Sequence, residues 1–139
     1  MKNFQTSMLL RNLIKDLPKS KTNIKIAGIS ADSNKIKKNF IFFAIKGKKN
    51  NGENFINDAI KKGASVIICS YTCNFNNKNI HVIKKKNVRN FLSEVASNYY
   101  SLKPKNIVAV TGTNGKTSVA DLFYQLFRLN NLSVASIGT

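Results

Sequence analysis

Short apolar runs alternate along this chain with segments of helical periodicity, and this alternation constrains the fold more than any other feature. Apolar runs that predict strands occupy residues 24–30, 40–45, 65–70 and 81–85. Helical spacing predicts helices at about 54–62, which ends at Gly63, and at 87–100. The run at 40–45, FIFFAI, is apolar at every position, which is typical of a strand buried on both faces. The pattern predicts an α/β fold with substantial parallel pairing.

A further helix is predicted at the N-terminus. Residues 4–17 carry apolar side chains at helical spacing, and Pro18 ends the pattern. These side chains are Phe4, Met8, Leu9, Leu13, Ile14 and Leu17.

A second unit is expected after Pro104, so we divide the chain into domains at 1–103 and 104–139. Residues 107–110 predict a strand, 116–129 a helix and 132–137 another strand, which together make one βαβ unit. Two parallel strands and one helix cannot bury both faces of a sheet. We therefore expect an incomplete second domain with exposed apolar side chains at Ile107, Val108 and Ile137.

The formal net charge of +17 suggests a polyanion as partner, but its composition weakens this interpretation. Residues 1–103 hold 20 basic and 5 acidic side chains, almost all the basic ones being lysines scattered among asparagines. Base recognition relies on arginine and stacking aromatic side chains, and the chain has only three arginines. Specific nucleic-acid binding is not expected, and a basic RNA-binding or polyanion-binding module stays an alternative.

Neither a membrane segment nor a metal cluster is predicted. No apolar stretch is long enough to cross a bilayer, and the N-terminus lacks the continuous apolar region of a signal peptide, so a cytoplasmic location is expected. Cys69 and Cys73 are separated by three residues, which is not a redox motif, and His81 is the sole histidine. Two reduced thiols at a strand end are expected.

The segment TGTNGKTS, residues 111–118, predicts a phosphate-binding loop between the predicted strand and helix. Gly112 and Gly115 can adopt positive φ and allow an anion to approach the backbone. The first amides of the following helix lack intrahelical partners and lie at the positive end of its dipole. Lys116 can meet the β- and γ-phosphates, and the Thr117 hydroxyl is placed to ligate Mg²⁺. The full predicted ATP-binding set is Gly112, Thr113, Asn114, Gly115, Lys116, Thr117 and Ser118.

The loop departs from the strict phosphate-loop pattern, because Val110 stands where that pattern has its first glycine. A magnesium site also needs acidic ligands. Downstream of Lys116 the only acidic residue is Asp121, inside the predicted helix. We expect the chain to hold nucleotide phosphates without turning over by itself.

Two blocks of sequence resemble the Mur ligase family of bacterial cell-wall synthesis, and within it the MurE type. VTGTNGKTS is similar to the ATP-binding loop of that family, and the segment from ADSNKIKKNF through KKGASVII is similar to its N-terminal domain. The resemblance implies a uridine-binding N-terminal domain followed by the start of a central ATPase domain. It also implies ATP-dependent addition of a diamino acid, either diaminopimelate or lysine, to UDP-MurNAc-L-Ala-D-Glu, with Lys116 as a catalytic group.

The resemblance also implies a UDP-sugar site at Ala31, Ser33, Lys48, Lys49 and Asn50. The sequence departs from the pattern of the family at two places in this region. Asn34 occupies a position where the family usually has arginine, and Lys38-Asn39 replace a common Gly-Asp pair.

Two alternatives within this resemblance stay open. A MurF-type ligase shares the N-terminal pattern, and residues 1–103 could instead act as a stand-alone uridine-nucleotide binder with a vestigial ATP loop. The oligomeric state is not predicted.

Overall fold

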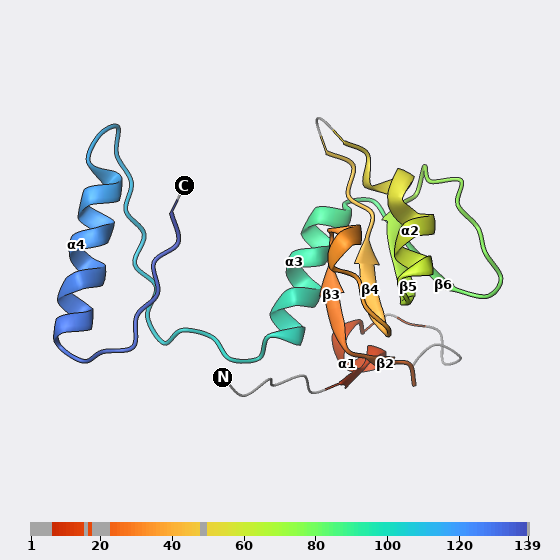
Figure 1. The fold of residues 1–139 in the computed structure, drawn as a ribbon, viewed down its shortest axis with the longest axis horizontal. Coiled ribbons are helices and arrows are strands. Elements are labelled where there is room, and N and C mark those ends of the chain that lie inside the picture. Colours follow the sequence, from red (N-terminus) through yellow and green to blue (C-terminus); the bar gives the residue numbers. More distant parts are fainter. Residues whose placement is uncertain (1–6, 16, 18–22, 48–49, 139) are drawn as a thin grey trace. The chain divides into compact units, whose positions relative to one another are not determined.

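The computed structural model describes residues 7–15, 17, 23–47 and 50–138. The chain divides into two compact units, Met1–Leu102 and Lys103–Thr139, which we describe separately (Figure 1).

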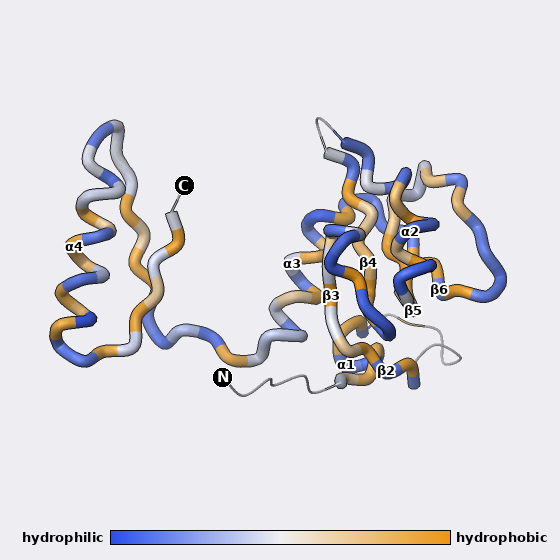
Figure 2. The backbone as a smooth tube through the Cα atoms, viewed as in Figure 1, coloured by the Kyte–Doolittle hydropathy of each residue, from blue (hydrophilic) through white to orange (hydrophobic). Residues whose placement is uncertain are grey.

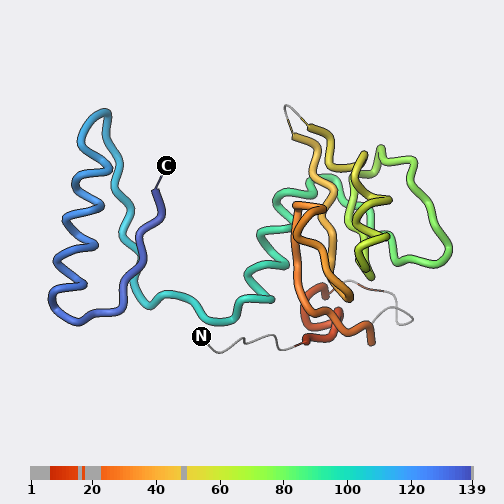
Figure 3. Tube along the Cα trace, in the orientation of Figure 1, coloured from red at the N-terminus to blue at the C-terminus, as the bar shows by residue number. Residues whose placement is uncertain are grey.

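The first unit is built on a four-stranded parallel sheet. Its strands are β3 (Gly28–Ser30), β4 (Phe40–Phe43), β5 (Ala64–Ser70) and β6 (His81–Lys85), and they lie in chain order, β3-β4-β5-β6 (Figure 3). Each neighbouring pair is parallel, so all four strands end at the same edge of the sheet. The predicted α/β fold with a parallel sheet is confirmed.

Successive side chains of β4 and β5 point to opposite faces of the sheet, and each face has its own apolar core. Ile41 and Phe43 of β4 join a cluster with residues of α1 (Leu10–Leu13) and α3 (Val88–Tyr99). Phe42 joins a second cluster with residues of α2 (Ile56–Lys61). Figure 1 shows α3 and α2 on opposite sides of the strands. The continuous apolar run of β4 is therefore explained by burial on both faces.

Helix α3 confirms the helix predicted at 87–100. The Asn87 side chain caps its start by accepting from the Asn90 N–H at 3.0 Å. Near its end, the Tyr99 hydroxyl donates to the Ala27 carbonyl at 2.8 Å and the Asn98 amide donates to the Leu13 carbonyl at 2.9 Å. These two bonds attach α3 to distant segments of the chain.

The turn after α2 also follows the sequence-based expectation. A 3₁₀ turn, η3 (Gly52–Phe55), leads into α2, and Gly63 follows it with φ of 102°. A Cβ atom at Gly63 would lie 2.8 Å from the Cα of Lys38. Both the left-handed backbone and this close approach require glycine at this position.

The N-terminal helix predicted at 4–17 is wrong over most of the residues that the structure describes there. Met8 and Leu9 form β1, which pairs antiparallel with β2 (Lys25–Ile26), and among the described residues of this segment only Leu10–Leu13 are helical. The Leu10 N–H donates to the carbonyl of Ile24, the residue just before β2, at 2.8 Å. This segment thus buries Leu13 and Ile14 in the core without a long helix. Phe4 lies outside the described residues.

The single strand predicted at 24–30 is divided between β2 and β3 at Ala27. Its N–H donates to the Asn39 carbonyl at 2.8 Å and its carbonyl accepts from Tyr99. Because both polar groups of Ala27 are bonded elsewhere, the strand changes sheet at this residue.

The second unit contains one helix, α4 (Lys116–Leu129), which confirms the helix predicted at 116–129. The strands predicted at 107–110 and 132–137 are not formed, since neither segment pairs with any described residue. A strand requires a hydrogen-bonded neighbour, and neither segment has one among the described residues of this unit. Ile107, Val108 and Ile137 are 84%, 63% and 100% exposed, which confirms the predicted exposure of these three side chains. Figure 2 shows apolar residues along α4 and both flanking segments.

Helix α4 ends in a well-formed cap, even though none of its residues is buried. Asn131 adopts a left-handed conformation with φ of 57°. The N–H groups of Asn131 and Leu132 donate to the carbonyls of Arg128 and Phe127 at 3.0 and 2.9 Å. This is a Schellman motif, in which local hydrogen bonds complete the helix end.

We predict that Phe43→Ala lowers the free energy of unfolding of the first unit by about 3–5 kcal/mol, because it removes a fully buried ring and leaves a cavity. Urea unfolding followed by circular dichroism measures the change. Tyr71→Ala, at a side chain that is 64% exposed, is the control and should change stability by less than about 0.5 kcal/mol. Equal effects of the two substitutions would contradict the core assignment.

Candidate functional site

The glycine-rich loop of the second unit has a backbone suited to binding an anion. Gly112 and Gly115 have φ of 150° and 74°, and Gly115 is the N-cap residue of α4. The first backbone bond of the helix runs from the Val119 N–H to the Gly115 carbonyl at 3.0 Å. The N–H groups of Lys116, Thr117 and Ser118 precede that bond and have no intrahelical acceptor. They lie at the positive end of the α4 dipole, where a phosphate would be stabilised.

Lys116 folds back over this loop. Its Nζ donates to the Gly112 carbonyl, and to the Thr113 carbonyl at 3.3 Å. The ammonium group therefore lies against the backbone of the loop, at the place where phosphates are expected to bind. The first turn of α4 has no acidic residue, so no carboxylate of that turn competes for these donors.

All seven residues predicted to bind ATP, 112–118, are contiguous and exposed. Thr117 can contribute one hydroxyl ligand to Mg²⁺, an ion that also takes carboxylate, phosphate and water oxygens as ligands. Among the described residues there is no group of three or more His, Cys, Asp or Glu side chains that could hold a metal ion. The loop itself, residues 112–118, contains a threonine hydroxyl but no carboxylate that could ligate the ion.

The residues predicted for the UDP-sugar site follow β3 and β4 at the carboxyl edge of the sheet. Ala31 is exposed and Ser33 is buried in the turn η2 (Ser33–Lys35). Asp32 caps this turn, because its carboxylate accepts from the Asn34 N–H at 2.9 Å. The Ser33 hydroxyl is therefore not the capping group of the turn.

The second predicted segment lies in the connection that follows β4 in the sequence. The Gly52 N–H donates to the Ile45 carbonyl and the Gly47 N–H donates to the Asn50 carbonyl, both at 2.9 Å. Asn50 is exposed, while Lys48 and Lys49 lie outside the described residues. These hydrogen bonds hold Asn50 beside Gly47, and Gly52 beside Ile45 just after the end of β4.

Sequence reasoning missed a hollow of about 340 Å³ at the carboxyl ends of β4, β5 and β6. Its position could have been found from the order of parallel strands, since ligands of open α/β sheets bind outside the carboxyl ends. The residues that line it are Ile45, Lys46, Ser70, Thr72, Lys86, Asn87, Val88 and Arg89.

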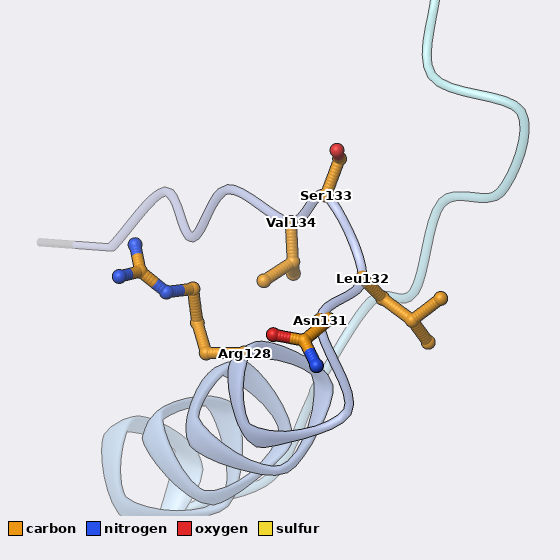
Figure 4. Close-up of a pocket in the computed structure, with 5 residues that line it drawn as sticks. All are labelled: Arg128, Asn131, Leu132, Ser133 and Val134. Atoms are coloured by element: carbon orange, nitrogen blue, oxygen red, sulfur yellow. The ribbon is translucent and has the colours of Figure 1, made fainter.

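A larger hollow, of about 470 Å³, lies at the C-terminal end of α4. Figure 4 shows that the side chains of Leu132 and Ser133 point away from the Arg128 guanidinium. Because its lining groups do not converge, this hollow does not define a site.

The two cysteines are free thiols buried at the end of β5 and in the turn after it. Burial, and then the hydrogen bond with Cys73, raises the pKa of the Cys69 thiol to about 12. Cys69 is therefore a neutral core side chain rather than a nucleophile. Among the helices of the described residues, none combines the length and apolar character that a membrane span requires.

Together these features define a class of protein, an α/β protein with a parallel sheet and a glycine-rich loop at a helix N-terminus. A family model described as "Mur ligase family, catalytic domain" matches residues 25–109. The chain belongs to the Mur ligase family.

The related sequences include UDP-N-acetylmuramoyl-L-alanyl-D-glutamate--2,6-diaminopimelate ligases. The protein from Rickettsia montanensis is 44% identical over 118 residues, which cover 83% of this chain and 24% of the relative. The protein from Clostridioides difficile is 37% identical over 138 residues, which cover 95% of this chain and 28% of the relative. The chain thus spans about a quarter of the length of these relatives.

Solved structures of the family share this fold. A UDP-N-acetylmuramoyl-L-alanyl-D-glutamate--2,6-diaminopimelate ligase matches with a TM-score of 0.73 and 24% identity, covering 96% of this chain and 28% of that one. The MurF ligase of Thermotoga maritima in complex with ADP matches with a TM-score of 0.60 and 26% identity, covering 73% and 23%.

We predict that the native chain reacts with iodoacetamide at Cys69 at least ~100-fold more slowly at pH 9 than the urea-unfolded chain, because burial holds the thiol protonated. Mass spectrometry of the labelled peptides measures the rates. The folded pKa lies above the ordinary value of 9.0, so this thiol should also lower the free energy of unfolding as pH rises from about 9 to about 12. Equal labelling rates in the two states would contradict the burial of Cys69.

Proposed function

We propose that this chain supplies the two nucleotide-binding regions of an ATP-dependent ligase that joins 2,6-diaminopimelate to UDP-MurNAc-L-Ala-D-Glu. The observation that carries the proposal is the glycine-rich loop at the start of α4, with its two positive-φ glycines and Lys116, in a member of the Mur ligase family. The identity of 44% to a diaminopimelate ligase supports the choice of substrates.

In this proposal the loop of residues 112–118 binds ATP. Its backbone N–H groups cradle the phosphates, Lys116 stabilises the charge of the transferring phosphoryl group, and Thr117 provides a ligand to Mg²⁺. The ADP complex of the Thermotoga maritima MurF ligase supports a nucleotide as the ligand of this family. We assign residues 104–139 to the ATP-binding region on these grounds.

Residues 1–103 are proposed to bind the UDP-sugar at the carboxyl edge of the parallel sheet. Ala31 and Ser33 follow β3, and the loop that carries Lys48, Lys49 and Asn50 follows β4. Nucleotides commonly bind at this edge of open α/β sheets.

The proposed reaction has two steps. The D-glutamate carboxylate attacks the γ-phosphorus of ATP, which forms an acyl phosphate and releases ADP. The amine of diaminopimelate then attacks the acyl carbon, an amide bond forms, and phosphate and a proton leave. ATP and nucleotide sugars are cytoplasmic metabolites, so we place the step in the cytoplasm. Because the chain spans about a quarter of its relatives, the diaminopimelate site is not assigned to these residues.

A MurF-type ligase is the second candidate, since several of the similar structures carry that name. The related sequences at 36–44% identity are diaminopimelate ligases, and they favour the first candidate. Among the solved structures, the diaminopimelate ligase at 24% identity and the MurF ligases at 17–26% do not separate the two candidates. A polyanion-binding module predicts affinity that falls steeply with salt and no preference for a nucleotide sugar.

We predict that Lys116→Ala weakens Mg-ATP binding at least ~10-fold, because a hydrogen bond to a charged phosphate contributes about 1.5–3 kcal/mol. Calorimetric titration of the 139-residue chain measures the affinity, and UDP-MurNAc-L-Ala-D-Glu binding should be unchanged.

The matched control is Lys105→Ala, which removes the same charge from an exposed position outside the loop. If Lys105→Ala weakened ATP binding as much as Lys116→Ala, general electrostatic attraction would replace the assigned role. Loss of UDP-sugar binding on raising the salt concentration would favour the polyanion-binding alternative.

A further inference from the structure

We propose that Asn114 is a site of spontaneous deamidation, and that the acidic residue formed there prevents the glycine-rich loop from binding phosphate. The modification itself follows from the local chemistry of Asn114 and Gly115 and requires no enzyme. Its effect on ATP rests on the proposed function of the loop.

The pair Asn114-Gly115 favours this reaction, because glycine has no Cβ atom to shield its backbone nitrogen. The Gly115 nitrogen gives its proton to hydroxide and attacks Cγ of Asn114. The new N–Cγ bond closes a five-membered succinimide, the Cγ–Nδ2 bond breaks, and the leaving nitrogen takes a proton from water and departs as ammonia. Water then opens the ring at either carbonyl, which leaves aspartate or isoaspartate. Each event consumes one water molecule and releases one ammonia molecule.

The chain holds a second Asn-Gly pair, at residues 51–52, and the structure protects it. Asn51 is half-buried, and its Oδ1 accepts from the Glu53 N–H at 3.1 Å. The Gly52 N–H donates to the Ile45 carbonyl at 2.9 Å. A Cβ atom at Gly52 would lie 2.6 Å from that carbonyl oxygen, so there is little room for a ring. Both reacting groups of this pair are therefore held apart by the fold.

The pair in the glycine-rich loop lacks this protection. Asn114 and Gly115 are both exposed. Neither the Asn114 side chain nor the Gly115 N–H forms a hydrogen bond with any residue that the structure describes. A Cβ atom at Gly115 would meet no other atom within 4 Å. The attacking nitrogen and the side-chain amide are therefore free to meet.

The positive potential of the loop favours the same reaction. The attacking group is the deprotonated amide of Gly115, which is an anion. Gly115 is the N-cap residue of α4, at the positive end of the helix dipole. The Lys116 ammonium group lies close by, where it donates to the carbonyls of Gly112 and Thr113. The charges that would bind a phosphate therefore also stabilise the anion that begins deamidation.

Both products would weaken phosphate binding. A carboxylate at position 114 would compete with a phosphate for the N–H groups at the start of α4 and for Lys116, and it would repel the phosphate charge. Isoaspartate also adds a methylene group to the main chain, which changes the spacing between Gly112 and Gly115. The loop would thus lose both its charge and its backbone geometry.

The first test is peptide mapping by mass spectrometry of the 139-residue chain after incubation at mildly alkaline pH. Asn114 should deamidate at least ~10-fold faster than Asn51, because Asn51 can react only after hydrogen bonds of the fold are broken. At neutral pH the rate at Asn114 should fall, since less of the Gly115 amide is deprotonated. The control is the chain unfolded in guanidinium chloride, in which the two pairs should react at similar rates.

The second test measures Mg-ATP binding by calorimetric titration. Asn114→Asp should weaken binding at least ~10-fold, because a carboxylate then occupies the donors of the loop. The matched control is Asn51→Asp, which adds the same charge to the first unit and should leave ATP affinity unchanged. In the incubated wild-type chain, the fraction that still binds ATP should equal the fraction in which Asn114 is intact.

The outcomes separate the modification from the proposed function. If Asn114 stayed as intact as Asn51 in a folded chain that binds ATP, the modification site would be overturned and the function would stand. Deamidation of Asn114 in a chain that binds no ATP even when fresh would support the modification site and overturn the ATP-binding function. Equal weakening by Asn114→Asp and Asn51→Asp would overturn the specific effect on the loop, because general charge repulsion would then explain the loss.

Discussion

The parallel pairing of β4 with β5 is the constraint on which the first unit depends. Ile41 pairs with Val66, Phe42 with Ile67 and Phe43 with Ile68, so both strands present apolar side chains to both faces. Other elements must therefore cover both faces of this strand pair. The chain meets this requirement with α1 and α3 on one face and α2 on the other. Parallel pairing also gives all four strands the same direction. The turns that carry the predicted UDP-sugar residues and those that line the hollow therefore lie at the same edge of the sheet.

The sequence predicted those secondary-structure elements whose signals lie within the element itself, and it failed where an element depends on distant residues. The strands β4, β5 and β6 and the helices α2, α3 and α4 were predicted within a few residues, because each carries its own apolar pattern, and α2 is also followed by Gly63 as a local end signal. The segment 8–13 was misassigned because its apolar spacing fits a helix while its backbone pairs with Lys25–Ile26. The division of residues 24–30 at Ala27 depends on Tyr99, which lies 72 positions away in the sequence.

In the second unit, local interactions complete the helix, whereas the flanking segments would need distant partners to form strands. Helix α4 is completed by interactions within the segment, with Gly115 at its start and the Schellman bonds around Asn131 at its end. The flanking segments 107–110 and 132–137 have strand-like sequences but need partners from elsewhere to become strands. A strand prediction states that a segment can pair, and only the rest of a sheet decides whether it does.

The two candidate sites also differ in whether their residues are adjacent or distant in the sequence. The glycine-rich loop is encoded in eight adjacent residues, so its spacing alone predicts the positive-φ glycines and the position of Lys116. The sheet-edge hollow is assembled from Lys46, Ser70 and Lys86, which belong to three separate strand ends and share no motif. In a Lys-rich chain, these lysines look like any other surface charge. Their partners distinguish them, because Lys84 and Lys85 are held by the Cys73 carbonyl and the Phe91 ring while Lys86 faces the hollow. The net charge of +17 therefore matters less for function than the few cations that the parallel sheet gathers at one edge.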